Sequence, residues 1–139
     1  MTAQDYLRRY KRAEARLRRL EAEYRREMEM IDAIRVSSDV DGMPHGNGIT
    51  KPTEDKAIRL ADKALSWKMA ALDAIQIRQE VFETIMKLDG LECDVLLERF
   101  VYLRKWEDVC ESVGYTWPTV RNAWHRGEER IEKLIQEVT

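Results

Sequence analysis

Two long stretches of the chain repeat apolar residues at alternating steps of three and four, the spacing of a helix with one apolar stripe. In the first stretch, the two rows of the stripe are Ala3, Tyr10, Leu17, Tyr24, Ile31 and Tyr6, Ala13, Leu20, Glu27, Ile34, with Glu27 as a polar interruption. Residues 1–34 contain no proline or glycine, so we expect one unbroken helix over about residues 3–34. A helix this long with so narrow a stripe must pack against another helix.

The second stretch predicts a helix over about residues 53–88. Thr53 is a suitable N-cap, and Glu54 and Asp55 in the first turn suit the helix dipole. The apolar stripe follows Ile58, Ala61, Leu65, Lys68, Met69, Leu72, Ile75, Gln79, Phe82 and Met86. We expect this stripe to face the first helix in an antiparallel hairpin. Trp67 lies off the stripe and is expected to face another chain, and Gly90 is expected to end the helix at C′.

Between these helices, residues 36–52 hold three glycines and two prolines, which predicts a loop. His45 lies in this loop with Asp39 and Asp41 nearby. One histidine with carboxylates on a flexible loop is a poor ligand set, so we expect no metal site.

A third helix is expected over about residues 91–103, with Val95, Leu96 and Phe100 facing inward. The next stretch, residues 106–125, has the spacing of a helix-turn-helix. A glycine suits the turn, which needs positive φ, and apolar or small residues are needed where the two helices cross. The residues in those places are Val109, Cys110, Val113, Gly114, Tyr115 and Val120.

The second helix of this motif has a clear start, because Thr116 suits an N-cap and Pro118 suits the first turn. Its outward surface is expected to consist of Thr116, Trp117, Thr119, Arg121, Asn122, His125 and Arg126. Arginine and asparagine bond bidentately to guanine and adenine edges, and threonine and histidine can hold phosphate oxygens. The pattern therefore predicts a DNA-reading helix; the alternative is a plain helical hairpin. Gly127 is expected to bend the helix that continues beyond it.

Composition sets further bounds. The chain has 139 residues, of which 36% are charged, and its longest apolar run is four residues, so we expect neither a membrane span nor a secretory signal. The two cysteines have no paired-ligand spacing, which favours a reducing, cytoplasmic compartment. We expect an all-α chain with a long hairpin over residues 1–90 and a small helix-turn-helix domain over residues 91–139.

The net charge of −2 is unevenly spread, with +3 over residues 1–35 and −3 over residues 91–139. An acidic helix-turn-helix domain binds DNA weakly, because affinity for DNA comes largely from neutralised phosphates. Such a domain would need a dimer, a basic partner surface or a second protein to hold it on DNA, and we expect a homo-oligomer with a dimer favoured. The chain has no phosphate-binding loop and no nucleophile–base motif, so we expect no enzymatic activity and no cofactor.

The C-terminal third resembles the fourth region of sigma factors, which reads promoter elements. The segments "LLERFVYLRK" and "WEDVCESVGYTWPTVRNAWHRGEERI" carry this resemblance. The matching features are Tyr102, Trp106, Glu107, Gly114, Thr116, Thr119, Val120, Arg121, His125 and Arg126. Pro118, Trp124 and Gly127 depart from that family's pattern.

The whole chain resembles a narrower family, the phage and prophage transcriptional regulators of the RinA/ArpU type. The long basic first helix, the "DGMPHGNG" loop, the "KPTED" helix start and the sigma-like C-terminus carry this second resemblance. It implies a late-gene activator in the cytoplasm of a bacterial host, with double-stranded DNA and RNA polymerase as partners.

Two other functions remain open at this point. One is a small terminase subunit, which also joins a helix-turn-helix to an oligomerising hairpin and would hold packaging-site DNA on a ring. The oligomeric state distinguishes the two functions, because a ring needs a heterologous interface and a dimer needs an isologous interface. The other is a protein–protein interaction module without any role on DNA.

Overall fold

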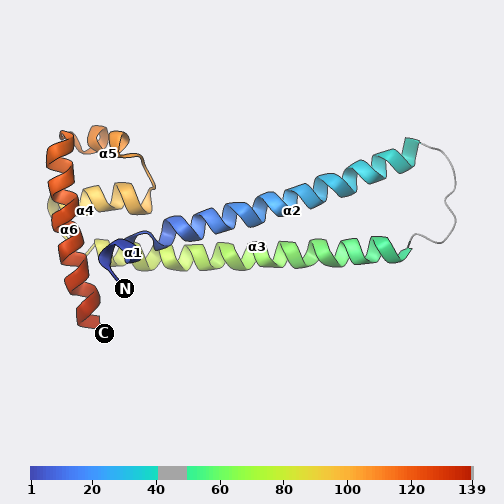
Figure 1. Ribbon diagram of the computed structural model, residues 1–139, viewed down its shortest axis with the longest axis horizontal. Coiled ribbons are helices and arrows are strands. Elements are labelled where there is room, and N and C mark those ends of the chain that lie inside the picture. The colour runs from blue at the N-terminus through green and yellow to red at the C-terminus, as the bar shows by residue number, and fades with distance from the viewer. Residues whose placement is uncertain (41–49, 139) are drawn as a thin grey trace. The chain divides into compact units, whose positions relative to one another are not determined.

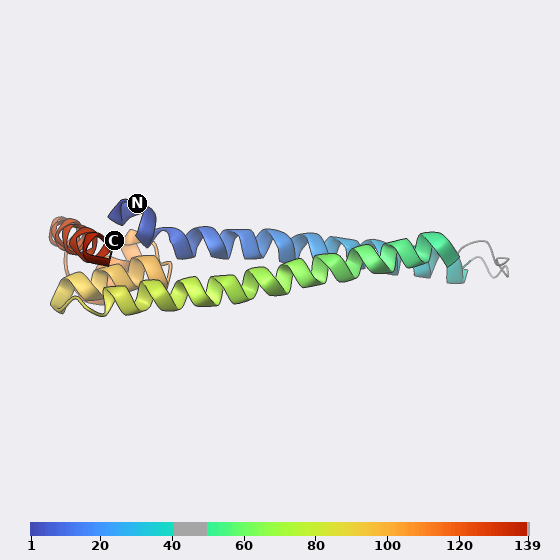
Figure 2. The ribbon, with the colours of Figure 1, turned by 90° about the horizontal axis from the view of Figure 1, so that it is seen from below.

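The computed structural model is all-α and describes residues 1–40 and 50–138 (Figure 1). Its elements in chain order are α1 (Ala3–Leu7), α2 (Arg9–Val40), α3 (Thr50–Ile85), α4 (Gly90–Leu96), the π-helical turn η2 (Leu97–Val101), α5 (Trp106–Val113) and α6 (Trp117–Val138). The long helices α2 and α3 pack antiparallel, and Figure 2 shows them side by side. The predicted fold class, a long hairpin followed by shorter helices, is confirmed.

The chain forms two compact units. Unit 1 comprises Met1–Glu14 and Asp73–Thr139, and unit 2 comprises Ala15–Leu72. This division differs from the expected boundary at residue 90, because α1 and the end of α3 pack with the C-terminal helices in unit 1.

The predicted first helix is interrupted at Arg8, which separates α1 from α2. Arg8 has φ −82° and ψ −4°, a turn conformation rather than a regular helical one. The interruption frees α1 to turn Ala3 and Leu7 into the core of unit 1, where both are buried. The prediction of an unbroken helix over residues 3–34 was therefore wrong, because tertiary packing overrides local propensity here.

The segment between the long helices is shorter than the predicted loop of residues 36–52. Helix α2 continues to Val40, since residues 36–40 contain no glycine or proline to stop it. Helix α3 begins at Thr50, before the predicted cap at Thr53. Pro52 then falls in the first turn, where its missing N–H is no loss. His45 and Asp41 lie outside the described residues.

Within unit 2, the polar interruption of α2 meets a polar partner on α3. Lys63 Nζ lies 2.8 Å from Glu27 Oε1 and 3.1 Å from Glu23 Oε1. Nearby, the Tyr24 and Trp67 rings pack with their centroids 5.3 Å apart. Trp67 therefore faces α2, and the expectation that it faces another chain was wrong.

The predicted facing side of α3 was also wrong. Its large stripe residues Ile58, Leu65, Met69, Leu72, Ile75 and Met86 are exposed, and only Phe82 among the large apolar members is half-buried. The side of α3 that faces α2 in unit 2 instead carries Lys63 and Trp67, with the half-buried Ala64 between them. Small residues permit close approach of two helices, so this side packs although its hydrophobic pattern is weaker.

The end of α3 also differs in detail from the prediction. The helix ends at Ile85, and a tighter turn follows in which Leu88 N–H donates to Ile85 O at 2.9 Å. Gly90 has φ +68°, but it begins α4 instead of serving as a C′ residue. Helix α4 gives way to η2 before the predicted end at Leu103, which itself has φ +55°.

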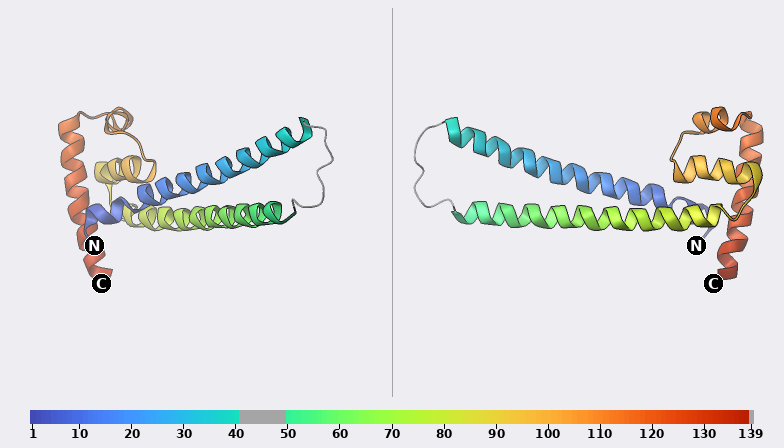
Figure 3. Two further views of the ribbon diagram at one scale, coloured as in Figure 1. Left: turned by 45° about the vertical axis from the view of Figure 1, so that its right-hand side comes forward. Right: turned by 180° about the vertical axis from the view of Figure 1, so that it is seen from behind.

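Unit 1 has two adjoining cores. The larger joins α1, α3, α4, η2 and α6, and consists of Ala3, Leu7, Val81, Ile85, Leu88, Cys93, Leu96, Phe100, Val101 and Ile131. The smaller joins α4, α5 and α6, and consists of Val95, Val109, Val120 and Ala123. The predicted inward positions Val95, Leu96 and Phe100 are confirmed. Figure 3 shows α5 beside the start of α6, with α1 packed farther along α6.

Helix α6 runs without a break through Gly127, where a bend was expected. A Cβ at this position would lie 2.8 Å from Leu96 Cδ1, so the missing side chain allows α4 and α6 to cross closely. Within the described residues, each helix is too short or too polar to cross a lipid bilayer.

Candidate nucleic-acid interface

Helices α5 and α6 are joined by a short turn at Gly114. Gly114 has φ 77° and ψ 26°, the left-handed conformation predicted for the turn glycine. Its N–H donates to Cys110 O at 3.0 Å, and Tyr115 N–H donates to the same carbonyl at 3.3 Å. These bonds close the end of α5 and redirect the chain into α6.

Helix α6 starts where the sequence predicts. Thr116 directly precedes it, and the Thr116 carbonyl accepts a hydrogen bond from Val120 N–H at 3.1 Å. Pro118 is the second residue of the helix, where the lack of an N–H does no harm. The angle of this helix start is therefore set by the chain's own residues.

One side of α6 is fixed against α4 and α5. Val120 and Ala123 are fully buried in the smaller core with Val109 of α5. Val113 and Cys110 are half-buried beside them, as predicted, but Tyr115 is 53% exposed and contributes less to this packing than expected. Because the buried side is fully apolar, α6 has little freedom to rotate about its axis.

The opposite side of α6 carries the residues predicted to face DNA. Thr116, Trp117, Arg121, Asn122, His125 and Arg126 are exposed, and Thr119 is half-buried. Among the described residues, neither the Arg121 guanidinium nor the Asn122 amide has a hydrogen-bond or ion-pair partner. Both groups are therefore available to a ligand.

Three tryptophans connect the starts of α5 and α6. The Trp106 ring centroid lies 5.3 Å from that of Trp117 and 4.6 Å from that of Trp124. On the outer side, His125 stacks on Trp124 at 4.6 Å between centroids. Trp117 is 41% exposed, so one part of its ring packs in this cluster and another part faces solvent. This cluster holds His125 and Trp117 in place beside Arg121.

Arg126 is exposed, but its charge is already paired. Its Nε donates to Glu92 Oε1 of α4 at 3.1 Å, and Arg130 Nη1 forms an ion pair with Glu92 Oε2 at 2.8 Å. Glu92 is only 8% exposed, so these two arginines neutralise a buried carboxylate. We therefore assign Arg126 mainly to holding α6 on α4, a use that the sequence pattern does not reveal.

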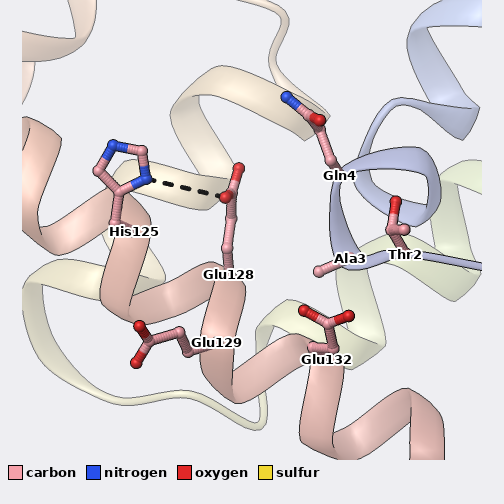
Figure 4. Close-up of a pocket in the computed structure, with 7 residues that line it drawn as sticks. All are labelled: Thr2, Ala3, Gln4, His125, Glu128, Glu129 and Glu132. Carbon is pink, nitrogen blue, oxygen red and sulfur yellow. Dashed lines mark ion pairs between the residues drawn. The ribbon is translucent and has the colours of Figure 1, made fainter.

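An acidic hollow lies beyond His125. It has a volume of about 560 Å³ and lies between the start of α1 and the middle of α6, within unit 1. Figure 4 shows its lining residues, Thr2, Ala3, Gln4, His125, Glu128, Glu129 and Glu132. His125 Nδ1 lies 3.8 Å from Glu128 Oε2. Carboxylates repel phosphate, so the surface suited to DNA ends at His125.

The burial of Glu92 and the packing of Trp106, Trp117 and Trp124 on one another are the features of this region that the sequence does not predict. A glutamate in a short helix gives no sign of its burial until α6 is placed beside it. The packing of Trp106 on Trp124 depends on the angle between α5 and α6, which the sequence does not give.

Among the described residues, no three His, Cys, Asp or Glu side chains come together as metal ligands. Comparison of the chain with protein-family models, with curated proteins and with solved structures found no match.

Proposed function

We propose that the chain is a non-enzymatic DNA-binding protein that inserts the first turns of α6 into the major groove of double-stranded DNA. The observation that carries this proposal is the two-sided character of α6. Val120 and Ala123 fix one side in the core, while Arg121 and Asn122 present unpaired hydrogen-bonding groups on the other. In helix-turn-helix proteins, the second helix lies in the major groove with its N-terminal residues at the base edges.

Each side chain then has a role that suits its chemistry. Arg121 would donate two hydrogen bonds to a guanine, and Asn122 would pair with an adenine. Thr116, Thr119 and His125 would hold phosphate oxygens on either side. Trp117 would cover a sugar or a thymine methyl group with the exposed part of its ring.

The charge of this surface favours specific over non-specific binding. On the first turns of α6, Arg121 is a cation without an acidic partner, whereas Arg126 is paired with Glu92. Few phosphates are neutralised by such a surface, and the acidic hollow beyond His125 adds repulsion. Tight binding therefore depends on base contacts, which suits a regulator that acts at defined sites. Together with the two resemblances described above, this favours a phage or prophage transcriptional regulator, with RNA polymerase as a further partner.

The test is selection of duplexes from a random pool, followed by affinity measurements on the selected sequence. Arg121→Ala and Asn122→Ala should each weaken binding by about 1–3 kcal/mol and relax the preference at one base position. Lys133→Ala is the matched control, since it removes an exposed cation from the same helix about 18 Å farther along. Unchanged affinity and preference in both Arg121→Ala and Asn122→Ala would contradict the proposal.

A further inference from the structure

The first turn of α6 presents apolar side chains on the surface proposed to meet DNA. Trp117 and Pro118 are the first two residues of the helix, and both are exposed. Trp117 lies one helical turn before Arg121, so the two side chains are neighbours on the helix surface. In helix-turn-helix proteins, the N-terminal residues of the second helix lie at the base edges. In the proposed complex, this apolar pair therefore meets a base pair directly.

The Trp117 ring is held in place without any ligand. Its centroid lies 5.3 Å from that of Trp106 at the start of α5 and 6.5 Å from that of Trp124 within α6. Trp106 is fixed in turn by the Phe100 ring, 6.4 Å away between centroids, and by the Arg99 guanidinium carbon, 4.8 Å from the Trp106 centroid. An aromatic side chain with a preset orientation loses little conformational entropy when it contacts a ligand. The exposed part of the Trp117 ring is therefore a preformed apolar contact surface.

The chemistry of this surface selects among the four bases. An indole has one N–H donor and no acceptor, and a proline side chain has neither. In the major groove, cytosine and adenine present amino groups, which would lose their hydrogen bonds to water under such a surface and gain none. Guanine presents two acceptors, of which a single indole N–H satisfies at most one. Thymine presents a C5-methyl group, the only apolar group on a major-groove base edge, and covering it removes apolar surface from water.

We propose that Trp117, with Pro118 beside it, reads the C5-methyl group of a thymine next to the base pair that Arg121 contacts. The inference rests on the proposed function, because it requires the start of α6 to lie in the major groove. It adds a specificity-determining contact of a different kind. Arg121 and Asn122 recognise hydrogen-bonding groups, whereas Trp117 recognises a methyl group. A contact between Trp117 and a deoxyribose would stabilise the complex without preference for any base.

The first test replaces the thymines of the selected duplex, one at a time, by deoxyuridine, which lacks the methyl group and keeps every hydrogen-bonding group of the base. The base pair that Arg121 contacts is located by the loss of preference in Arg121→Ala. At a thymine next to it, replacement should weaken binding of the wild-type chain about fourfold, the effect of leaving one methyl group in water. A selected sequence without thymine next to that base pair, or equal affinity for every deoxyuridine duplex, would overturn the proposal.

The second test assigns the methyl contact to Trp117. Trp117→Ala should bind the thymine and deoxyuridine duplexes equally, because the contact is already lost. Tyr102→Ala is the matched control, since Tyr102 is an exposed aromatic residue of unit 1 that lies beside Arg78 of α3, and this variant should keep the full difference. Circular dichroism checks the fold of both variants, and the first test needs no variant of Trp117. A full difference in folded Trp117→Ala would assign the methyl group to another residue and overturn the proposal.

These outcomes separate the thymine contact from the proposed function. Specific binding that weakens in Arg121→Ala, with no effect of deoxyuridine at any position, would overturn the thymine contact and leave DNA reading by α6 in place. Binding without sequence preference, or binding unchanged in both Arg121→Ala and Asn122→Ala, would overturn both.

Discussion

At the scale of single residues, Gly127 shows how close packing depends on a missing side chain. A Cβ there would lie 2.8 Å from Cδ1 and 3.2 Å from Cγ of the fully buried Leu96, so the Leu96 side chain would have to shift. The sequence alone predicts only that glycine weakens a helix, because its contact with Leu96 depends on how α4 and α6 cross. The same is true of Glu92, whose burial follows from the two arginines that α6 brings to it.

We expect Gly127→Ala to destabilise unit 1 by about 1 kcal/mol. Alanine gains about 1 kcal/mol of helix propensity over glycine, while overpacking against a buried leucine costs about 1–3 kcal/mol. Thermal unfolding measures the balance, with Lys133→Ala as an exposed control on the same helix. A gain in stability from Gly127→Ala would show that the crossing is looser than described.

Cys93 should react slowly with thiol reagents in the folded protein. Its side chain is buried, and burial, followed by the nearby charges of Asp94 and Asp89, raises the pKa of the thiol. At pH 8 we expect alkylation of the half-buried Cys110 well before Cys93, as mass spectrometry of digested samples would show. Because the folded pKa is raised, stability is full below the ordinary thiol pKa of 9.0 and falls as pH rises above it. Rapid labelling of both cysteines would count against the burial of Cys93.

At the scale of elements, local signals were sufficient for some helices and insufficient for others. The start of α6 and the turn at Gly114 were predicted, because a cap, an early proline and a positive φ are properties of a few adjacent residues. The facing side of α3 was not predictable, because this helix has apolar residues on two sides. Which side meets α2 is decided by contacts such as Trp67 with Tyr24, which require both helices to be placed.

The Lys63–Glu27 contact should stabilise the hairpin in a pH-dependent way. The hydrogen bond from Lys63 lowers the pKa of Glu27, and the bonds to Glu27 and Glu23 raise the pKa of Lys63. The stabilisation is therefore full between the ordinary values of 4.5 and 10.5; it is lost as pH falls through the lowered pKa of Glu27 or rises through the raised pKa of Lys63.

We therefore expect Lys63→Met to lower the melting temperature at pH 7 relative to Lys11→Met, an exposed control on α2. The difference should shrink as the pH falls through the lowered pKa of Glu27, and in high salt, which screens the charges. An equal melting temperature for the two variants at pH 7 would mean that the polar pair does not stabilise the hairpin.

At the scale of the whole molecule, the low positive charge of the proposed DNA-binding surface bears on the expected oligomeric state. The net charge of the chain is −2. Among the described residues, the outer side of the first turns of α6 has a single unpaired arginine, Arg121, because Arg126 is paired with Glu92. Each copy therefore offers few contacts to phosphate groups. The dimer expected from the sequence would supply a second α6 and offset the weakness of one. The division into two units could not be read from the sequence, because the packing of α1 with α6 joins segments more than a hundred residues apart.

This charge balance predicts a shallow salt dependence of DNA binding. The slope of log K against log salt concentration is about −0.9 for each phosphate neutralised. With one to three phosphates per copy, we expect a slope of about −1 to −3 per copy, measured by fluorescence anisotropy between 50 and 200 mM salt. A slope near −10 would indicate a broad basic surface and would point to the arginines of α2 instead of α6.

Hydrogen–deuterium exchange of the full chain, with and without its selected duplex, tests most directly whether α6 binds DNA. We expect DNA to slow exchange over residues 114–126, the turn and the start of α6. Residues 15–34 of α2, where exposed arginines gather, should exchange at the same rate in both samples. Protection confined to residues 15–34, with none at the start of α6, would contradict DNA binding through α6.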